Sequence, residues 1–294
     1  MFGFRSRRLA AARGRFADEL AQRLGLAAPL RDAFAAVPRE RFLPPGPWLV
    51  LGGQAGYEST PDADPVRVYC DAAIAIDAAR ILNSSQPSLA AGILAALDVR
   101  PGGSVLHVGC ASGYYTAILA ELAGARGRVV GYEISPAIAE WAQRNLRAWR
   151  QVEVRREDAL ESALPEADVV WIDAGVTQIR DAWLDALRLG GRLALPLTAV
   201  RASLRAPRFT RNHIGRVLFV SREARGLRAR FGEGVAIMGL HGGRDAGEQS
   251  LLDAAYRRGG WEQVRSLRRD PHASEATCWA HLGAVCLSRR DLIG

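Results

Sequence analysis

The feature that most constrains this 294-residue sequence is the alternation of strand-like and helix-like segments between residues 104 and 197. Short apolar runs such as SVLHVG and ADVVWIDAG alternate with amphipathic runs such as YTAILAELAG and SPAIAEWAQRNLRAW. Strands and helices that alternate in this way form βαβ units, which build a mainly parallel sheet with helices on both faces. The sequence therefore predicts an α/β protein.

The periodicity places five strands and three helices in this region. The expected strands cover residues 104–109, 128–134, 152–158, 167–175 and 192–197, and the expected helices cover 115–124, 135–149 and 178–191. Ser135 and Pro136 suit the first two positions of a helix. A further helix is expected over 85–103, where it ends at Pro101-Gly102-Gly103.

The flanking regions show different patterns. Residues 15–43 predict two short amphipathic helices, and 44–80 read as irregular, with GGQAGYESTPDADP as an exposed loop. After residue 200 we expect antiparallel strands over 215–231 and 234–240, a helix over 247–260, and a final strand or hairpin over 277–288. The expected organisation is an N-terminal helical and loop region (1–80), a cofactor-binding core (81–200) and a C-terminal α+β extension (201–294) that recognises substrate.

The composition excludes several classes of protein. The net charge is +8, but all 39 basic residues are arginines, and they are scattered among acids instead of forming one stripe, which disfavours nucleic-acid binding. Four cysteines in a chain of this length do not make a disulfide framework. Because no apolar run reaches the length of a membrane span and no signal-peptide pattern occurs, we expect a cytoplasmic protein.

A glycine turn after the first core strand predicts a nucleotide site. Gly109 and Gly113 lie where that strand passes into a helix, and such turns admit ligands at the carboxyl ends of parallel strands. Glu133 ends the next strand, from which a carboxylate can accept both hydroxyls of an adenosine ribose; the alternative is a solvated acid at the end of a strand. The Gly-x-Ala-x-Gly spacing is shorter than the dinucleotide fingerprint, and no Gly-Lys-Ser/Thr loop occurs, which favours S-adenosyl-L-methionine (SAM). Asp158, after the third strand, could bind the adenine amine or be a surface acid.

Several longer motifs resemble the protein-L-isoaspartate O-methyltransferase family over about residues 28–200. They are AFAAVPRERFLPPG, NSSQPSLAAGILAALDVRPGGSVLHVGCASGYYTAILAELAG, GRVVGYEISPAIAEWAQRNL and LRLGGRLALPL, of which VPRERF and SQP are the most specific. The resemblance implies a Rossmann-like class I methyltransferase sheet with N-terminal helices. It also implies that SAM esterifies the α-carboxylate of isoaspartyl residues, after which the ester collapses to a succinimide.

The resemblance also implies roles for individual residues. Ser85 matches the serine of the Ser-Gln-Pro motif between cofactor and substrate, while Asn83 and Ser84 replace the usual threonine-hydrophobic pair; both serines could alternatively cap the following helix. We assign Asn83, Ser84 and Ser85 to catalysis. The residues assigned to cofactor binding are His107, Gly109, Cys110, Ala111, Gly113, Glu133, Ile134, Asp158, Ala159 and Asp173.

Two of these residues depart from the family pattern. His107 replaces the usual glutamate near the methionine end of the cofactor, and it is either a neutral hydrogen-bonding substitute, a weakening change, or a buried structural histidine. Ala111 replaces the middle glycine of the turn, which is tolerable where the backbone φ is negative.

The C-terminal tail resembles that of family members that modify ribosomally made peptides, including those near lanthipeptide pathways. We therefore expect a dedicated peptide substrate with an aspartyl or isoaspartyl carboxylate, such as a natural-product precursor. The alternatives are a general isoaspartyl repair enzyme, a nucleic-acid methyltransferase and a non-catalytic peptide-binding module.

His272, Cys278, His281 and Cys286 suggest zinc ligands. In one straight strand Cys278 and Cys286 would be about 26 Å apart, too far to share a metal, whereas a hairpin turning at Leu282-Gly283 would bring them closer. We favour strand packing and expect no metal.

Overall fold

The computed structural model describes residues 2–52, 56–200 and 213–292. The chain forms two compact units, residues 1–103 with 110–156 and residues 104–109 with 157–294. We describe them in turn and call them the first and second unit. The expected boundaries at residues 80 and 200 stay a prediction.

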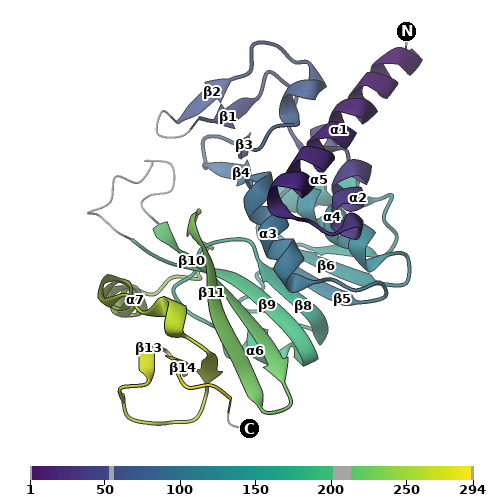
Figure 1. Cartoon of the computed structure of the whole chain (residues 1–294). Helices are drawn as coiled ribbons and strands as arrows, with labels where there is room; N and C mark the ends of the chain where they lie inside the picture. Colours follow the sequence, from purple (N-terminus) through teal and green to yellow (C-terminus); the bar gives the residue numbers. More distant parts are fainter. Residues whose placement is uncertain (1, 53–55, 201–212, 293–294) are drawn as a thin grey trace. The chain divides into compact units, whose positions relative to one another are not determined.

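The first unit contains most of the helices (Figure 1). Its helices are α1 (Phe2–Leu24), α2 (Ala28–Ala36), α3 (Pro87–Leu97), α4 (Tyr114–Ala123) and α5 (Pro136–Leu146). Its strands are β1 (Leu49–Leu51), β2 (Tyr57–Ser59), β3 (Ile74–Asp77), β4 (Leu82–Ser84), β6 (Arg128–Tyr132) and β7 (Val152–Arg155). The first four strands form an antiparallel sheet in the order β2-β1-β3-β4, and β6 pairs with β7 in parallel. Short 3₁₀ turns occur at Arg39–Phe42 and Pro65–Val68.

The second unit is built on one mixed sheet. Its strands are β5 (Ser104–Val108), β8 (Ala167–Ile172), β9 (Leu187–Val200), β10 (His213–Glu223), β11 (Gly226–Ala236), β12 (Ser266–Arg268), β13 (Cys278–Leu282) and β14 (Val285–Ser288). They lie in the order β13-β14-β12-β11-β10-β9-β8-β5. The pairs β5–β8 and β8–β9 are parallel, and all pairs beyond β9 are antiparallel. Among its described residues are also α6 (Asp181–Asp185), α7 (Ala246–Arg258) and a 3₁₀ turn at Trp261–Gln263.

This architecture confirms the expected α/β fold, with parallel strands in the core, N-terminal helices and an antiparallel C-terminal extension. The central strands are buried as their sequences predict: Val169, Val170, Trp171 and Ile172 of β8 are each at most 3% exposed. The final hairpin is confirmed by β13 and β14. Among the described residues no helix is long and apolar enough to cross a membrane.

Four expectations about local structure are wrong. The strands expected over 215–231 and 234–240 are β10 and β11, which are separated by a turn at residues 224–225 and not between 231 and 234. The N-terminal helix α1 begins at Phe2, because the run of arginine, alanine and leucine before residue 15 has high helix propensity. Residues 44–80 contain β1, β2 and β3 instead of irregular chain. The helix expected over 178–191 ends at Asp185, and β9 begins at Leu187 opposite Ala167; the Gly190-Gly191 pair, with Gly190 at φ +82°, suits a bent strand better than a helix.

Candidate cofactor and substrate site

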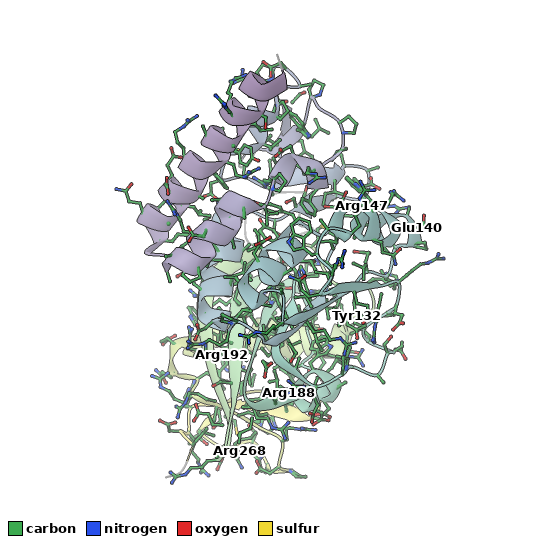
Figure 2. The ribbon with its side chains drawn as sticks, turned by 90° about the vertical axis from the view of Figure 1, so that its right-hand side faces the viewer. Tyr132, Glu140, Arg147, Arg188, Arg192 and Arg268 are labelled. Carbon is green, nitrogen blue, oxygen red and sulfur yellow. The ribbon has the colours of Figure 1, made fainter. Side chains whose placement is uncertain are left out.

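In the first unit, the turn that precedes α4 is held by the residues that end β6. The Cys110 amide donates to the carbonyl of Tyr132 over 3.0 Å. Tyr132, which is labelled in Figure 2, is the last residue of β6. The Glu133 carboxylate accepts hydrogen bonds from the Ala111 amide (3.1 Å) and, through its other oxygen, from the Ser135 amide (2.9 Å). Glu133 is buried, with 8% exposed. The turn and the expected ribose acid therefore lie in direct contact.

Two residues near this carboxylate, Ile134 and Cys110, differ in solvent exposure. Ile134, directly after Glu133, is 45% exposed. Cys110 is buried, and a Cβ added to Gly131 would lie 3.1 Å from its sulfur. The small residue at 131 thus leaves the space that Cys110 fills beneath the turn.

Ala111 adopts a backbone conformation that alanine disfavours. Its φ is +48°, so the condition under which we expected alanine to be tolerated, a negative φ, is not met. The left-handed conformation costs an L-residue with a Cβ about 1–2 kcal/mol. The hydrogen bond from its amide to Glu133 helps to hold this geometry.

Ala111→Gly should raise the free energy of unfolding by about 0.5 kcal/mol, because relief of the strained φ exceeds the entropy that glycine adds to the unfolded chain. Urea unfolding followed by circular dichroism measures this change. Ala137→Gly is the control: Ala137 is exposed in α5, so there glycine should lower stability by about 0.5–1 kcal/mol. A loss of stability in both variants would contradict the strain at Ala111.

The Asn83-Ser84-Ser85 segment is tied to the same helix. The Tyr115 hydroxyl, in the first turn of α4, donates to the Ser85 carbonyl oxygen, and the Tyr57 hydroxyl donates to Asn83 Oδ1. Ser84 is 4% exposed, and its buried Oγ has no hydrogen-bond partner among the described residues. Gln86, not a serine, occupies the N-cap position of α3 and makes no side-chain cap. The capping alternative is therefore wrong for Ser84, whereas for Ser85 it stays open.

Asp71, which the sequence did not reveal, holds the start of α3. Its carboxylate accepts hydrogen bonds from the Ser88 amide (2.8 Å) and from Gln86 Nε2 (3.2 Å), and it pairs with Arg23 at 2.5 Å. Burial opposes the charge, but these hydrogen bonds outweigh it and keep the pKa of Asp71 below its ordinary value. Gln86 and Ser88 follow Asp71 by 15 and 17 positions in the sequence, so these contacts form only when the chain is folded.

The lowered pKa predicts an acid-sensitive contribution to stability. Because the pKa of Asp71 is lower folded than unfolded, its contribution is complete above the unfolded pKa of about 4 and is lost as the pH falls through the folded value. Asp71→Asn should cost about 1 kcal/mol at pH 7 and less in acid. Thermal unfolding across the acid range measures this difference. Asp32→Asn is the control, since Asp32 is 61% exposed on α2; a pH-independent difference for Asp71→Asn would contradict the linkage.

The VPRERF motif has a structural role. Arg39 is fully buried and donates to three backbone carbonyls, those of Val68 (3.0 Å), Cys70 (2.8 Å) and Ala72 (2.8 Å). Its guanidinium also lies 5.7 Å from the ring centre of Tyr114, the first residue of α4. The motif therefore fixes the segment that carries Asp71 against the helix that follows the cofactor turn.

In the second unit, His107 lies on β5 beside Trp171 of β8. The two rings are stacked, with centres 4.5 Å apart and planes inclined by 8°. His107 Nε2 is 3.8 Å from Asp173 Oδ2, and the side chains are 1% and 10% exposed. The Asp173 amide donates to the Val108 carbonyl over 2.9 Å, just before Gly109 ends the strand. This geometry fits the buried structural histidine among the three possibilities; a contact with the cofactor stays a prediction.

Asp158 starts a tight turn after β7. Its Oδ1 accepts from the Leu160 amide (2.9 Å), and its carbonyl accepts from the Ser162 hydroxyl (2.8 Å). The turn buries Ala159, which is 4% exposed. Asp158 itself is half-buried, so it is not a fully solvated surface acid.

A family model described as protein-L-isoaspartate(D-aspartate) O-methyltransferase (PCMT) matches residues 17–223, more than half of the chain. The chain belongs to this family. Among similar proteins, the protein-L-isoaspartate O-methyltransferase of Methanopyrus kandleri is 32% identical over 171 residues, which cover 56% of this chain and 67% of the relative. That of Pyrobaculum neutrophilum is 31% identical over 203 residues, covering 65% and 88%.

Solved PCMT structures share the fold. A protein-L-isoaspartate O-methyltransferase aligns with a TM-score of 0.59 at 20% identity, covering 87% of this chain and 72% of the other. A β-aspartate methyltransferase from Plasmodium falciparum in complex with S-adenosyl-L-homocysteine aligns with a TM-score of 0.59 at 14% identity, covering 78% and 97%. As a PCMT member, the protein is a SAM-dependent protein carboxyl O-methyltransferase. The family match supports neither the nucleic-acid nor the non-catalytic alternative.

Proposed function

We propose that the protein methylates the α-carboxylate of isoaspartyl residues in proteins and peptides, the activity for which its relatives are named. One observation carries the proposal: residues 111–115, the end of the glycine turn and the start of α4, contact both the acid proposed for the cofactor and the segment proposed for the substrate. Ala111 contacts Glu133 on the cofactor side, and Tyr115 contacts Ser85 on the substrate side. This choice replaces a natural-product precursor as the leading expectation.

The residues suit the transfer of a methyl group to a carboxylate. We propose that Glu133 holds the ribose hydroxyls, Ile134 packs on the adenine, and Asp158 binds the adenine amine. His107, Gly109, Cys110, Gly113, Ala159 and Asp173 complete the proposed cofactor contacts. SAM supplies a methyl group on a sulfonium, so the carboxylate oxygen forms the new C–O bond while the C–S bond breaks and S-adenosylhomocysteine leaves.

The chemistry needs positioning more than acid–base catalysis. A carboxylate is already ionised at neutral pH, so no general base is required. We propose that the Ser84 and Ser85 hydroxyls and the Asn83 amide orient the acceptor and exclude water from it, which raises the rate through alignment and desolvation. The buried Oγ of Ser84 supports this role, because a buried hydroxyl costs free energy unless a partner satisfies it.

A matched pair of peptides tests the activity. An isoaspartyl peptide and its aspartyl twin differ only in which carboxylate extends the backbone. With SAM as methyl donor, the protein should methylate the first peptide and leave the second unchanged. Mass spectrometry should detect a methyl ester that base removes and that decays to the succinimide. A base-stable product, or methylation of RNA alone, would overturn the proposal.

One observation favours a more dedicated substrate as a second candidate. The family match ends at residue 223, and β11, α7, β12, β13 and β14 lie beyond it. We propose that this extension can select one ribosomally made peptide, such as a precursor encoded by a neighbouring gene. Preference for that precursor over a panel of unrelated isoaspartyl peptides would support it, and equal rates for all of them would overturn it. A cytoplasmic location stays a prediction.

A further inference from the structure

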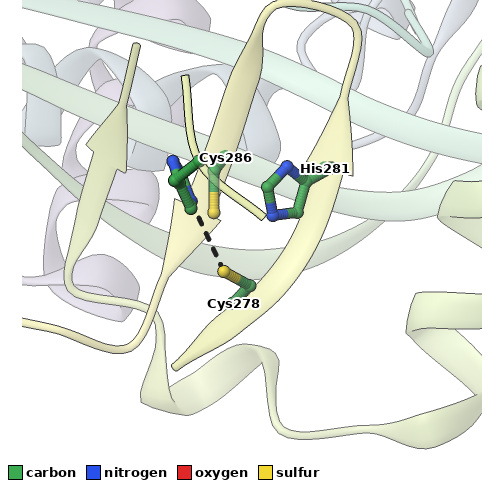
Figure 3. Close-up of side chains that lie close together, drawn as sticks. Cys278, His281 and Cys286 are labelled. Carbon is green, nitrogen blue, oxygen red and sulfur yellow. Dashed lines mark hydrogen bonds between the residues drawn. The ribbon is translucent and has the colours of Figure 1, made fainter. Parts of the chain in front are cut away.

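The C-terminal hairpin of the second unit gathers two histidines and two cysteines. The ligand atoms of His272, Cys278, His281 and Cys286 all lie within 4.8 Å of one another. Figure 3 shows Cys278 and His281 on β13 turned toward Cys286 on β14. Of the two geometries considered from the sequence, the structure has the hairpin: the chain reverses at Gly283, whose φ is +59°.

Strand register explains how these residues meet. His281 lies directly opposite Cys286, so their side chains share one face of the hairpin. Residues 278 and 281 are an odd number of positions apart and would point to opposite faces in a regular strand. A register shift between Cys278 and Ala280 adds a β-bulge, which returns Cys278 to the face of His281. The opposite face carries Trp279, which is 2% exposed and packs edge-on against Phe231.

The distances within the cluster suit a tetrahedral metal. Zinc bonds of about 2.3 Å to sulfur and about 2.0 Å to nitrogen place neighbouring ligand atoms of a tetrahedron about 3.6 Å apart. The Cys278 Sγ and His272 Nε2 atoms are 3.5 Å apart. The rings of His272 and His281 have centres 4.8 Å apart and are tilted by 53°, so they are not stacked on each other.

The surrounding groups orient the ligands for metal binding. His272 Nδ1 is 2.7 Å from the Asp270 carbonyl oxygen, so Nδ1 carries the proton and Nε2 presents a lone pair toward Cys278. The Glu275 amide donates to Cys278 Sγ over 3.4 Å, an interaction that stabilises a thiolate. His281 Nε2 is buried and has no hydrogen-bond partner among the described residues. Each of these contacts leaves a ligand atom facing the cluster centre.

We propose that His272, Cys278, His281 and Cys286 bind one zinc ion in a structural site. Two thiolates and two imidazoles in a tetrahedral arrangement are a donor set that zinc prefers. Four protein ligands leave no open position for substrate or water, so the metal is structural and takes no part in methyl transfer. It would anchor residues 269–277, which form neither helix nor strand, to the hairpin.

Metal analysis of the untagged full chain tests the site. Purified without chelators from zinc-supplemented cells, the protein should contain one zinc ion per chain by plasma mass spectrometry. Cys278→Ser and Cys286→Ser should lose it. Cys70→Ser is the matched control, because Cys70 is a free, half-buried cysteine of the first unit, and this variant should keep the metal.

Cobalt provides a test that does not depend on whether the serine variants fold. Wild-type protein stripped of metal and titrated with Co²⁺ should develop the visible bands of tetrahedral cobalt and a sulfur-to-cobalt charge-transfer band, and one equivalent of Zn²⁺ should abolish both. Chelation should also lower the thermal unfolding midpoint. A zinc-free wild type with no cobalt bands would overturn the proposal, as would zinc retained in both serine variants or a Cys278–Cys286 disulfide in freshly purified protein.

Discussion

Glu133→Gln should raise the dissociation constant for SAM by about 100-fold or more. A hydrogen bond to a charged group contributes about 1.5–3 kcal/mol, and the proposed role gives Glu133 two of them to the ribose. Glutamine keeps the shape of the side chain but replaces one acceptor oxygen with a donor, which faces either a ribose hydroxyl or the amides of Ala111 and Ser135. Isothermal titration with SAM and with S-adenosylhomocysteine measures the loss.

Glu140→Gln is the matched control for this variant. Glu140, labelled in Figure 2, lies on α5, and its side chain is 57% exposed. Glu140→Gln therefore makes the same chemical change at an exposed position. We expect unchanged affinity there, since an exposed carboxylate of this kind contributes little. Thermal unfolding of Glu133→Gln separates a lost ligand contact from a disordered turn. Unchanged SAM affinity in a folded Glu133→Gln would refute the ribose assignment.

The sequence predicts the core elements well because hydrophobic period and glycine position are local signals. The strand at 104–108, the helix starting after Gly113 and the acid at the end of β6 all follow from residues close together in the chain. The family motifs add the cofactor and the reaction class. Both kinds of signal concern residues whose conformation depends mainly on their immediate neighbours.

The parts that sequence reasoning missed depend on contacts between distant segments. Asp71 and Arg39 act on residues 15 to 33 positions away, which no periodicity reports. The φ of Ala111, which the amide contact with Glu133 helps to hold, contradicts alanine's own preference. The metal-ligand cluster requires a turn at Gly283 and a bulge in β13, and an unbroken apolar pattern gives no sign of the bulge.

Gly113→Ala should destabilise the protein by about 3 kcal/mol and abolish methyl transfer. The φ of Gly113 is +95°, where a Cβ is strained, and a Cβ would lie 2.7 Å from Leu146 Cδ1 in the core face of α5. Strain of about 1–2 kcal/mol adds to overpacking of about 1–3 kcal/mol. Relief of either would move α4 away from the turn that contacts Glu133. Urea unfolding and the isoaspartyl peptide assay measure the two effects.

Gly92→Ala is the matched control for Gly113→Ala. It tests whether the position of the glycine, and not the loss of a glycine as such, causes the loss of stability and activity. Gly92 lies within α3, and a Cβ there would meet nothing within 4 Å. Alanine is favoured over glycine inside a helix by about 1 kcal/mol, so this variant should be more stable than the wild type and fully active. If Gly113→Ala were as stable and active as Gly92→Ala, the turn would tolerate a side chain. The close approach to Leu146 could then not be what fixes the cofactor turn.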